Sequence, residues 1–167
     1  MKRILLSVLV LPILASCGLQ PLYSGGSTGG VASALQNVEI APITGRAGWL
    51  MRNAINDRLT SAGSGAATYR LDVKLDDTIE GFGVRSDDSV TRERRTLRAR
   101  YQLVELATGK TVLDATAGSD AGIDVVSSEY ATIAAENTAL ENLSQEVASQ
   151  IVTRLSLYAR SNVTPDE

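Results

Sequence analysis

The residues best suited to ligand chemistry in this sequence are five arginines that lie within nine consecutive positions of an otherwise acidic chain. They are Arg92, Arg94, Arg95, Arg98 and Arg100. A guanidinium group forms paired hydrogen bonds with a phosphate or a carboxylate, which a lysine ammonium group cannot do. Successive residues on one face of a strand are about 6.6–7 Å apart. A row of arginines at that pitch fits a surface that carries several phosphate groups.

The alternation around these arginines predicts which of them point away from the core. Apolar residues occupy every second position at Leu97, Ala99, Tyr101 and Leu103, which is typical of a half-buried strand. The opposite face then carries Arg92, Arg94, Arg98 and Arg100, with Thr96 and Gln102. These four arginines are the candidate contacts for a ligand or for acidic groups of a partner protein. The alternative is that they protect a sheet edge by charge and pair with Asp72, Asp76 or Asp114 on neighbouring strands.

Nothing in the sequence predicts a catalytic or metal centre. The chain has no histidine and a single cysteine, which excludes serine–histidine and thiol–imidazole catalysis and the usual zinc ligand sets. A hydrolase would have to work with carboxylates such as Asp76, Asp87 or Asp88, and these show no catalytic spacing. Asp87-Asp88, with Asp76-Asp77 nearby, also lacks the register of a calcium loop, so we interpret them as solvated turn carboxylates. We therefore expect a protein that is not an enzyme and has no metal or cofactor.

The N-terminal residues have the features of an export signal. Positive charge at Lys2 and Arg3 precedes an apolar run over residues 4–13, and small residues precede Cys17. The run is too short to cross a bilayer, which needs about 20 apolar residues. Residues 14–17, Leu-Ala-Ser-Cys, resemble the lipobox of bacterial lipoproteins. That resemblance implies removal of residues 1–16 as a lipoprotein signal peptide, a lipid on the Cys17 thiol and an acylated Cys17 amine. An ordinary secretory signal followed by a free or buried thiol is the alternative.

The remaining chain divides into a tether and one domain. Removal of Lys2 and Arg3 changes the net charge from −3 to −5, which argues against a nucleic acid partner. We expect residues 17–36 to form a flexible tether, because their centre is rich in Gly and Ser. Residues 37–161 form the domain, and residues 162–167 a polar tail.

The periodicity within the domain predicts an α+β fold. We expect strands over residues 38–43, 69–76, 92–103 and 111–117, and helices over residues 49–61 and 129–160. Residues 45–48, 81–83 and 86–89 are predicted to be turns or loops. The order predicts a two-layer sandwich, with two helices packed on one face of a four-stranded, mostly antiparallel sheet. The arginines would then lie on the face that the helices leave open.

Several segments in their order resemble one family. The start of the mature chain, Cys17-Gly18-x-x-Pro21-Leu22-Tyr23, the Asp-Asp-Ser-Val-Thr-Arg entry to the arginine strand (residues 87–92) and the long last helix resemble LPS-assembly lipoproteins of the LptE family, alphaproteobacterial type. The resemblance implies an outer-membrane lipoprotein that plugs the β-barrel LptD and assists its assembly. That pair inserts lipopolysaccharide into the outer leaflet. The residue that follows the lipidated cysteine, Gly18, is compatible with sorting of the lipoprotein to the outer membrane. The resemblance also suggests lipopolysaccharide as the ligand of the arginine face. The alternative is a lipoprotein auxiliary subunit of an ABC-type lipid transport system.

Overall fold

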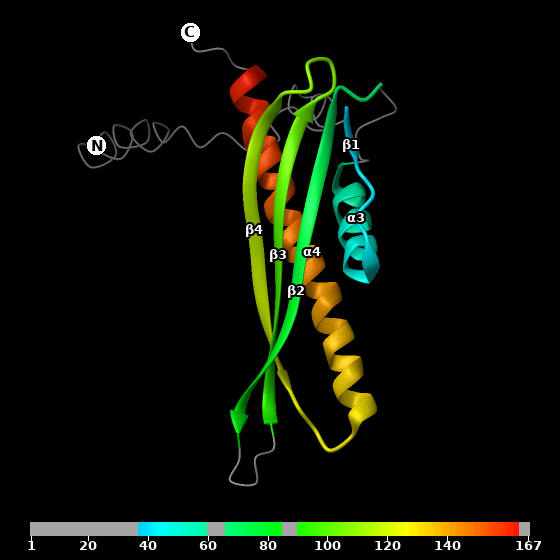
Figure 1. Ribbon diagram of the computed structural model, residues 1–167, viewed down its shortest axis with the longest axis vertical. Helices are drawn as coiled ribbons and strands as arrows, with labels where there is room; N and C mark the ends of the chain where they lie inside the picture. The colour runs from blue at the N-terminus through cyan, green and yellow to red at the C-terminus, as the bar shows by residue number, and fades with distance from the viewer. Residues whose placement is uncertain (1–36, 60–65, 85–89, 164–167) are drawn as a thin grey trace, which may run out of the picture.

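The computed structural model describes residues 37–59, 66–84 and 90–163 (Figure 1). The export signal, Cys17, the tether, Asp87 and Asp88 lie outside these residues. The elements are β1 (Val38–Ile40), α3 (Gly45–Leu59), β2 (Tyr69–Val84), β3 (Val90–Glu105), β4 (Thr111–Asp124) and α4 (Glu129–Val163).

The strands form one mixed sheet in the order β1-β2-β3-β4. β1 is parallel to β2, because α3 carries the chain back between them, and the two hairpins β2–β3 and β3–β4 are antiparallel. Figure 1 shows both helices on the same side of the sheet, running opposite to β2. The predicted two-layer α+β sandwich is therefore confirmed.

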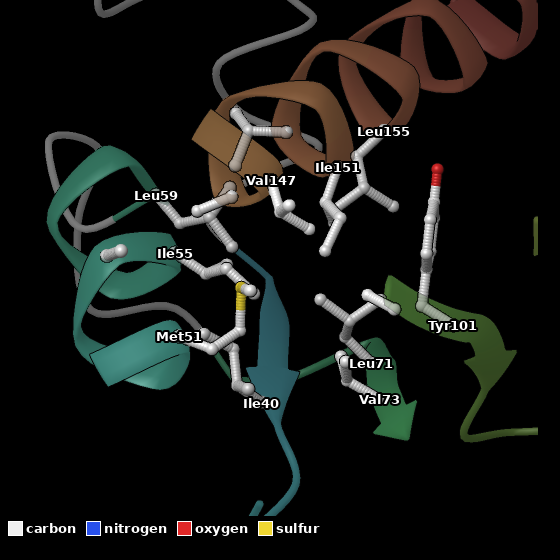
Figure 2. Packing of buried hydrophobic residues seen from close by; sticks show 14 of the residues in the cluster. Ile40, Met51, Ile55, Leu59, Leu71, Val73, Tyr101, Val147, Ile151 and Leu155 are labelled. Carbon is white, nitrogen blue, oxygen red and sulfur yellow. The ribbon is translucent and has the colours of Figure 1, made fainter. Parts of the chain in front are cut away.

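The core lies between the helices and one face of the sheet (Figure 2). Met51 and Ile55 of α3 and Ile151 of α4 have no exposed surface, and neither has Leu71 of β2. Burial of each such side chain contributes about 1.5–3 kcal/mol. The stripe of α4 that faces the core consists of residues three or four positions apart, as the sequence predicted: Leu140, Leu143, Val147, Ile151 and Leu155.

β2 and β4 are much longer than predicted, β3 is longer by two residues at each end, and β1 ends at Ile40 instead of residue 43. β2 continues through Gly81-Phe82-Gly83, which the sequence indicated as a loop, and β4 continues from Ala117 to Asp124. Pairing with β3 explains both extensions, since Phe82 lies opposite Arg92 and Arg92 lies opposite Asp124. The backbone hydrogen bonds of the ladder hold these segments extended although their own side chains give little strand signal.

Both helices also differ from prediction at one end. α3 begins at Gly45, within the predicted turn 45–48. In its first turn, Arg46 donates to Asn137 Oδ1 and lies 3.7 Å from Glu141 of α4. α4 extends to Val163, so the predicted start of a frayed tail at residue 162 is wrong. Asn162 Nδ2 donates to the carbonyl oxygen of Tyr158 at 2.9 Å and caps this last turn. Residues 164–167 lie outside the described part of the chain.

Candidate anion-binding face of the sheet

The helices leave one face of the sheet open, and the four predicted arginines lie there. Arg92, Arg94, Arg98 and Arg100 are all exposed, whereas Arg95, Leu97 and Ala99, at the alternate positions, are buried on the helix side. Apart from Phe82 opposite Arg92, polar or small residues stand opposite them on β2 and β4, such as Asp76 across from Arg98 and Thr116 across from Arg100. The predicted orientation of these side chains is therefore confirmed, whereas their ligand role stays a prediction.

Two of the four arginines are paired with aspartates near the end of β4. Arg92 Nε donates to Asp124 Oδ1 at 3.0 Å, and Arg94 Nε lies 3.7 Å from Asp120 Oδ2. The Arg94 guanidinium also lies over the Phe82 ring, 5.3 Å from its centroid. Such exposed pairs contribute little to stability, but they neutralise these two positive charges.

Arg100 is paired at the other end of β4. Its Nη2 and Nε donate to the two carboxylate oxygens of Asp114 at 3.0 and 3.4 Å, and Gln102 Nε2 donates to the same carboxylate at 2.8 Å. The Arg100 hydrogen bond, and then that of Gln102, hold the pKa of Asp114 below its usual value. Asp114 was one of three aspartate partners that the alternative interpretation offered. Of the other two, Asp72 pairs with Arg70 of its own strand, and Asp76 has no ion pair with a described residue. The pairing with Asp120 and Asp124 was missed, because β4 was expected to end at Ala117.

Arg98 differs from its neighbours. No carboxylate among the described residues lies within 4.0 Å of its guanidinium. Its register partner on β4 is Gly118, and its partner on β2 is Asp76. A Cβ atom at Gly118 would lie 3.3 Å from Arg98 Cγ. The stem of Arg98 therefore crosses the glycine, at a position where the strand offers no acid.

A hollow of about 500 Å³ surrounds this arginine on the open face. Lys74 lines it and, like Arg98, has no ion pair with a described residue. Asp76 supplies one unpaired negative charge. Arg100 and Asp120, which also line the hollow, are neutralised by Asp114 and Arg94 respectively. Two free positive charges against one negative charge leave the hollow with a net charge of +1. The main open-face lining residues are Lys74, Asp76, Thr96, Arg98, Arg100, Thr116, Gly118 and Asp120.

The fifth arginine has a structural position that the sequence did not predict. Arg95 lies on the helix face, where its Nε and Nη2 donate to the two carboxylate oxygens of Asp77 at 2.8 and 2.6 Å. Its Nη1 donates to the carbonyl oxygen of Glu136 in α4 at 2.9 Å. The hydrogen bond to Asp77 raises the pKa of Arg95, against the opposing effect of burial. The alternation did place Arg95 opposite the other four, and that was the available signal.

The acidic residues do not converge on a catalytic or metal centre within the described ranges. Asp76 lies in β2, within the predicted strand 69–76. Asp77 continues that strand, so its interpretation as a turn carboxylate is wrong; the two side chains point to opposite faces of the sheet. Within residues 37–59, 66–84 and 90–163, no three metal-ligating side chains gather at one place. In the same ranges, neither helix has the length of apolar sequence needed to span a membrane.

Solved structures with this fold come from several bacteria. A protein described as a lipoprotein from Caulobacter crescentus matches with a TM-score of 0.64 and 23% identity, covering 78% of this chain and 96% of its own. Rare lipoprotein B from Shewanella oneidensis matches with a TM-score of 0.60 and 9% identity, covering 76% of this chain and 98% of its own. A minor lipoprotein from Acinetobacter baumannii matches with a TM-score of 0.59 and 13% identity, covering 73% of this chain and 92% of its own. At these identities the likeness shows the fold alone.

The sequence itself identifies the family. No curated protein matches the chain in a sequence search. The family described as LptE, lipopolysaccharide-assembly, matches residues 35–155, which include every strand, α3 and most of α4. The chain therefore belongs to the LptE family of lipopolysaccharide-assembly proteins.

Proposed function

We propose that this protein is an outer-membrane lipoprotein, anchored by lipid on Cys17, whose domain plugs an LptD-like β-barrel, assists its assembly and binds lipopolysaccharide on the open face of the sheet. Its work in this proposal is binding and not catalysis. Family membership supports the place in lipopolysaccharide assembly. The proposed binding site is supported by Arg98, whose guanidinium has no ion pair with a described residue.

Arg98 carries the binding proposal because its charge is not already neutralised. Arg92, Arg94 and Arg100 each have an aspartate of β4 within 4.0 Å. A phosphate that bound one of these three would have to compete with that carboxylate. Arg98 and the nearby Lys74 offer a free guanidinium and a free ammonium group, and both match the phosphates of lipopolysaccharide.

The expected affinity suits a protein that passes its ligand on. Hydrogen bonds to a charged group contribute about 1.5–3 kcal/mol each. Two such bonds, less the cost of ordering the side chains, correspond to a dissociation constant on the order of millimolar for a single phosphate group. We infer that the hollow holds lipopolysaccharide briefly, while acyl chains and the barrel partner supply the remaining interaction.

Two measurements test this function. The full-length acylated protein is purified from its own envelope in mild detergent, and its partners are identified by mass spectrometry. A stoichiometric large β-barrel is expected. Recovery of inner-membrane ABC components without a barrel would replace the plug role with that of an auxiliary transport subunit.

The second measurement compares Arg98→Gln with Arg92→Gln in binding of purified lipopolysaccharide. Loss of Arg98 should weaken binding roughly tenfold, the equivalent of one charged hydrogen bond. Loss of Arg92 should change binding much less, because that guanidinium is occupied by Asp124. Equal effects of the two variants would refute the assignment of the site to Arg98.

A further inference from the structure

A second hollow lies around the edge of the sheet from Arg98, between β4 and α4. Its volume is about 400 Å³. Three residues that line it also line the open-face hollow, namely Thr116, Ala117 and Gln150. The two hollows are therefore parts of one surface that passes from the open face, over the outer edge of β4, to the side of α4.

The edge of β4 is narrow where this surface crosses it. Ala115, Ala117 and Gly118 are small, so the side chains at the border of the two hollows are those of Thr116 and Gln150, which line both. Gln150 of α4 covers the backbone at this point: its Oε1 accepts from the Gly118 N–H at 3.2 Å, and its Nε2 donates to the Gly118 carbonyl oxygen at 3.4 Å. Because the Gly118 N–H and carbonyl groups at this edge are already hydrogen-bonded to Gln150, we expect charged side chains to determine which ligand this surface binds.

The second hollow has its own free positive charge. Arg154 of α4 is exposed and has no ion pair with any residue in the described ranges. It lies beside Tyr101, whose ring rises from β3 toward Leu155 of α4 in Figure 2. The nearest acid on the helix is Glu146, one turn before Gln150, whose Oε1 accepts from Gln150 Nε2 at 3.2 Å.

We propose that the anion site on the open face continues around the β4 edge to Arg154, so that a ligand with two separate anionic groups is held by Arg98 on one side and by Arg154 on the other. This inference rests on the proposed lipopolysaccharide function and deepens it. The ligand class is a glycolipid whose headgroup carries two phosphates. Binding of the first phosphate raises the effective concentration of the second near Arg154, so that two weak contacts strengthen each other.

The test uses the full-length acylated protein in detergent and two probes, diphosphoryl lipid A and monophosphoryl lipid A. Wild type should bind the diphosphoryl probe roughly tenfold more tightly, by about one charged contact. Arg154→Gln should remove that preference and leave monophosphoryl binding unchanged. Arg98→Gln should weaken binding of both probes. Arg52→Gln on α3, an exposed arginine with no ion pair to a described residue, is the matched control and should change neither.

The outcomes separate the two proposals. If Arg154→Gln keeps the wild-type preference while Arg98→Gln loses affinity, the second contact is refuted and the proposed function stands. If Arg98→Gln binds both probes as the wild type does, the proposed lipopolysaccharide site at Arg98 is refuted and the second contact is refuted with it. Because Arg154 has an exposed side chain, its replacement is not expected to disturb folding, which circular dichroism verifies.

Discussion

Arg95 and Asp77 form the most enclosed ion pair among the described residues, with two hydrogen bonds of 2.8 and 2.6 Å and side chains 11% and 23% exposed. Arg95 also donates to the Glu136 carbonyl oxygen, so the pair joins the sheet to the first turns of α4. These turns need such a link, because Thr132 is the sole buried side chain between Glu129 and Thr138.

Replacement of Asp77 by Asn should therefore lower the free energy of unfolding by about 2–3 kcal/mol, since a largely desolvated guanidinium loses its carboxylate. Urea unfolding followed by circular dichroism measures the change. Asp114→Asn is the matched control, because it removes an aspartate from an arginine that is 67% exposed. It should destabilise the domain clearly less than Asp77→Asn does, because exposed ion pairs contribute little to stability. Equal losses of stability in the two variants would contradict the inference that the Arg95–Asp77 pair holds the first turns of α4 to the sheet.

The carboxylate of Asp114 should titrate at a lower pH than an unpaired aspartate. Arg100 and Gln102 hold its pKa below the ordinary value of an aspartate, because both donate to the ionised form. A folded pKa below the unfolded one means that the pair stabilises the fold above the unfolded pKa. That contribution is lost as the pH falls through the folded pKa. Carboxyl-carbon NMR measures the midpoint, and Arg100→Gln should raise it. A midpoint unaffected by Arg100→Gln would show that the hydrogen bonds do not persist in solution.

The orientation of the arginines was predictable, but which of them form an ion pair with an aspartate was not. Alternation with Leu97, Ala99 and Tyr101 is a local signal, and it placed Arg98 on the open face. Neutralisation depends on which residues stand across the sheet. Asp120 and Asp124 lie in a Gly/Ser/Ala-rich segment that resembles a strand poorly and becomes one only by pairing with β3.

The same limit explains what was missed around the site. Gly81-Phe82-Gly83 reads locally as a turn, and Gly83 does have a left-handed φ of 78°. The segment is nevertheless extended, because β3 continues opposite it. Arg154 carried no signal at all, since a lone arginine in a helix is ordinary. Arg154 is a candidate contact because it lines the same hollow as the small residues Ala115 and Ala117 of β4, and folding alone brings these residues together.

Gly48 should be required for the packing at the start of α3. A Cβ atom there would meet the Ile43 carbonyl oxygen at 2.5 Å and its carbon at 2.7 Å, both backbone atoms that cannot turn aside. Gly48→Ala should therefore destabilise the domain by about 1–2 kcal/mol, although alanine favours a helix by about 1 kcal/mol over glycine. Thermal unfolding measures the change. Ser149→Ala, on the exposed side of α4, should not destabilise. A Gly48→Ala variant as stable as wild type would show that residues 41–44 move aside freely.

Asp76 should weaken anion binding in the hollow. It is the unpaired acid opposite Arg98, and it reduces the local charge contributed by Arg98 and Lys74 from +2 to +1. Asp76→Asn should therefore tighten lipopolysaccharide binding roughly three- to tenfold at low salt, with a smaller gain at high salt because exposed charges are screened. Asp72→Asn, which frees Arg70 on the same strand but outside the hollow, is the control. Unchanged affinity in Asp76→Asn would place the phosphate elsewhere.

The two glycines on the open face of β4 should respond differently to the same substitution. A Cβ at Gly118 would lie 3.3 Å from both Arg98 Cγ and the Leu97 carbonyl oxygen, whereas a Cβ at Gly122 meets nothing within 4 Å. Gly118→Val should fill the floor of the hollow, displace the Arg98 stem and weaken lipopolysaccharide binding by about the tenfold expected for Arg98→Gln. Gly122→Val should leave binding unchanged and stabilise the strand by up to about 1 kcal/mol, since valine favours extended backbone. Binding isotherms and urea unfolding of both variants separate the effect on the site from the effect on the fold. If Gly118→Val binds normally, the position of Arg98 over this glycine does not matter for the ligand.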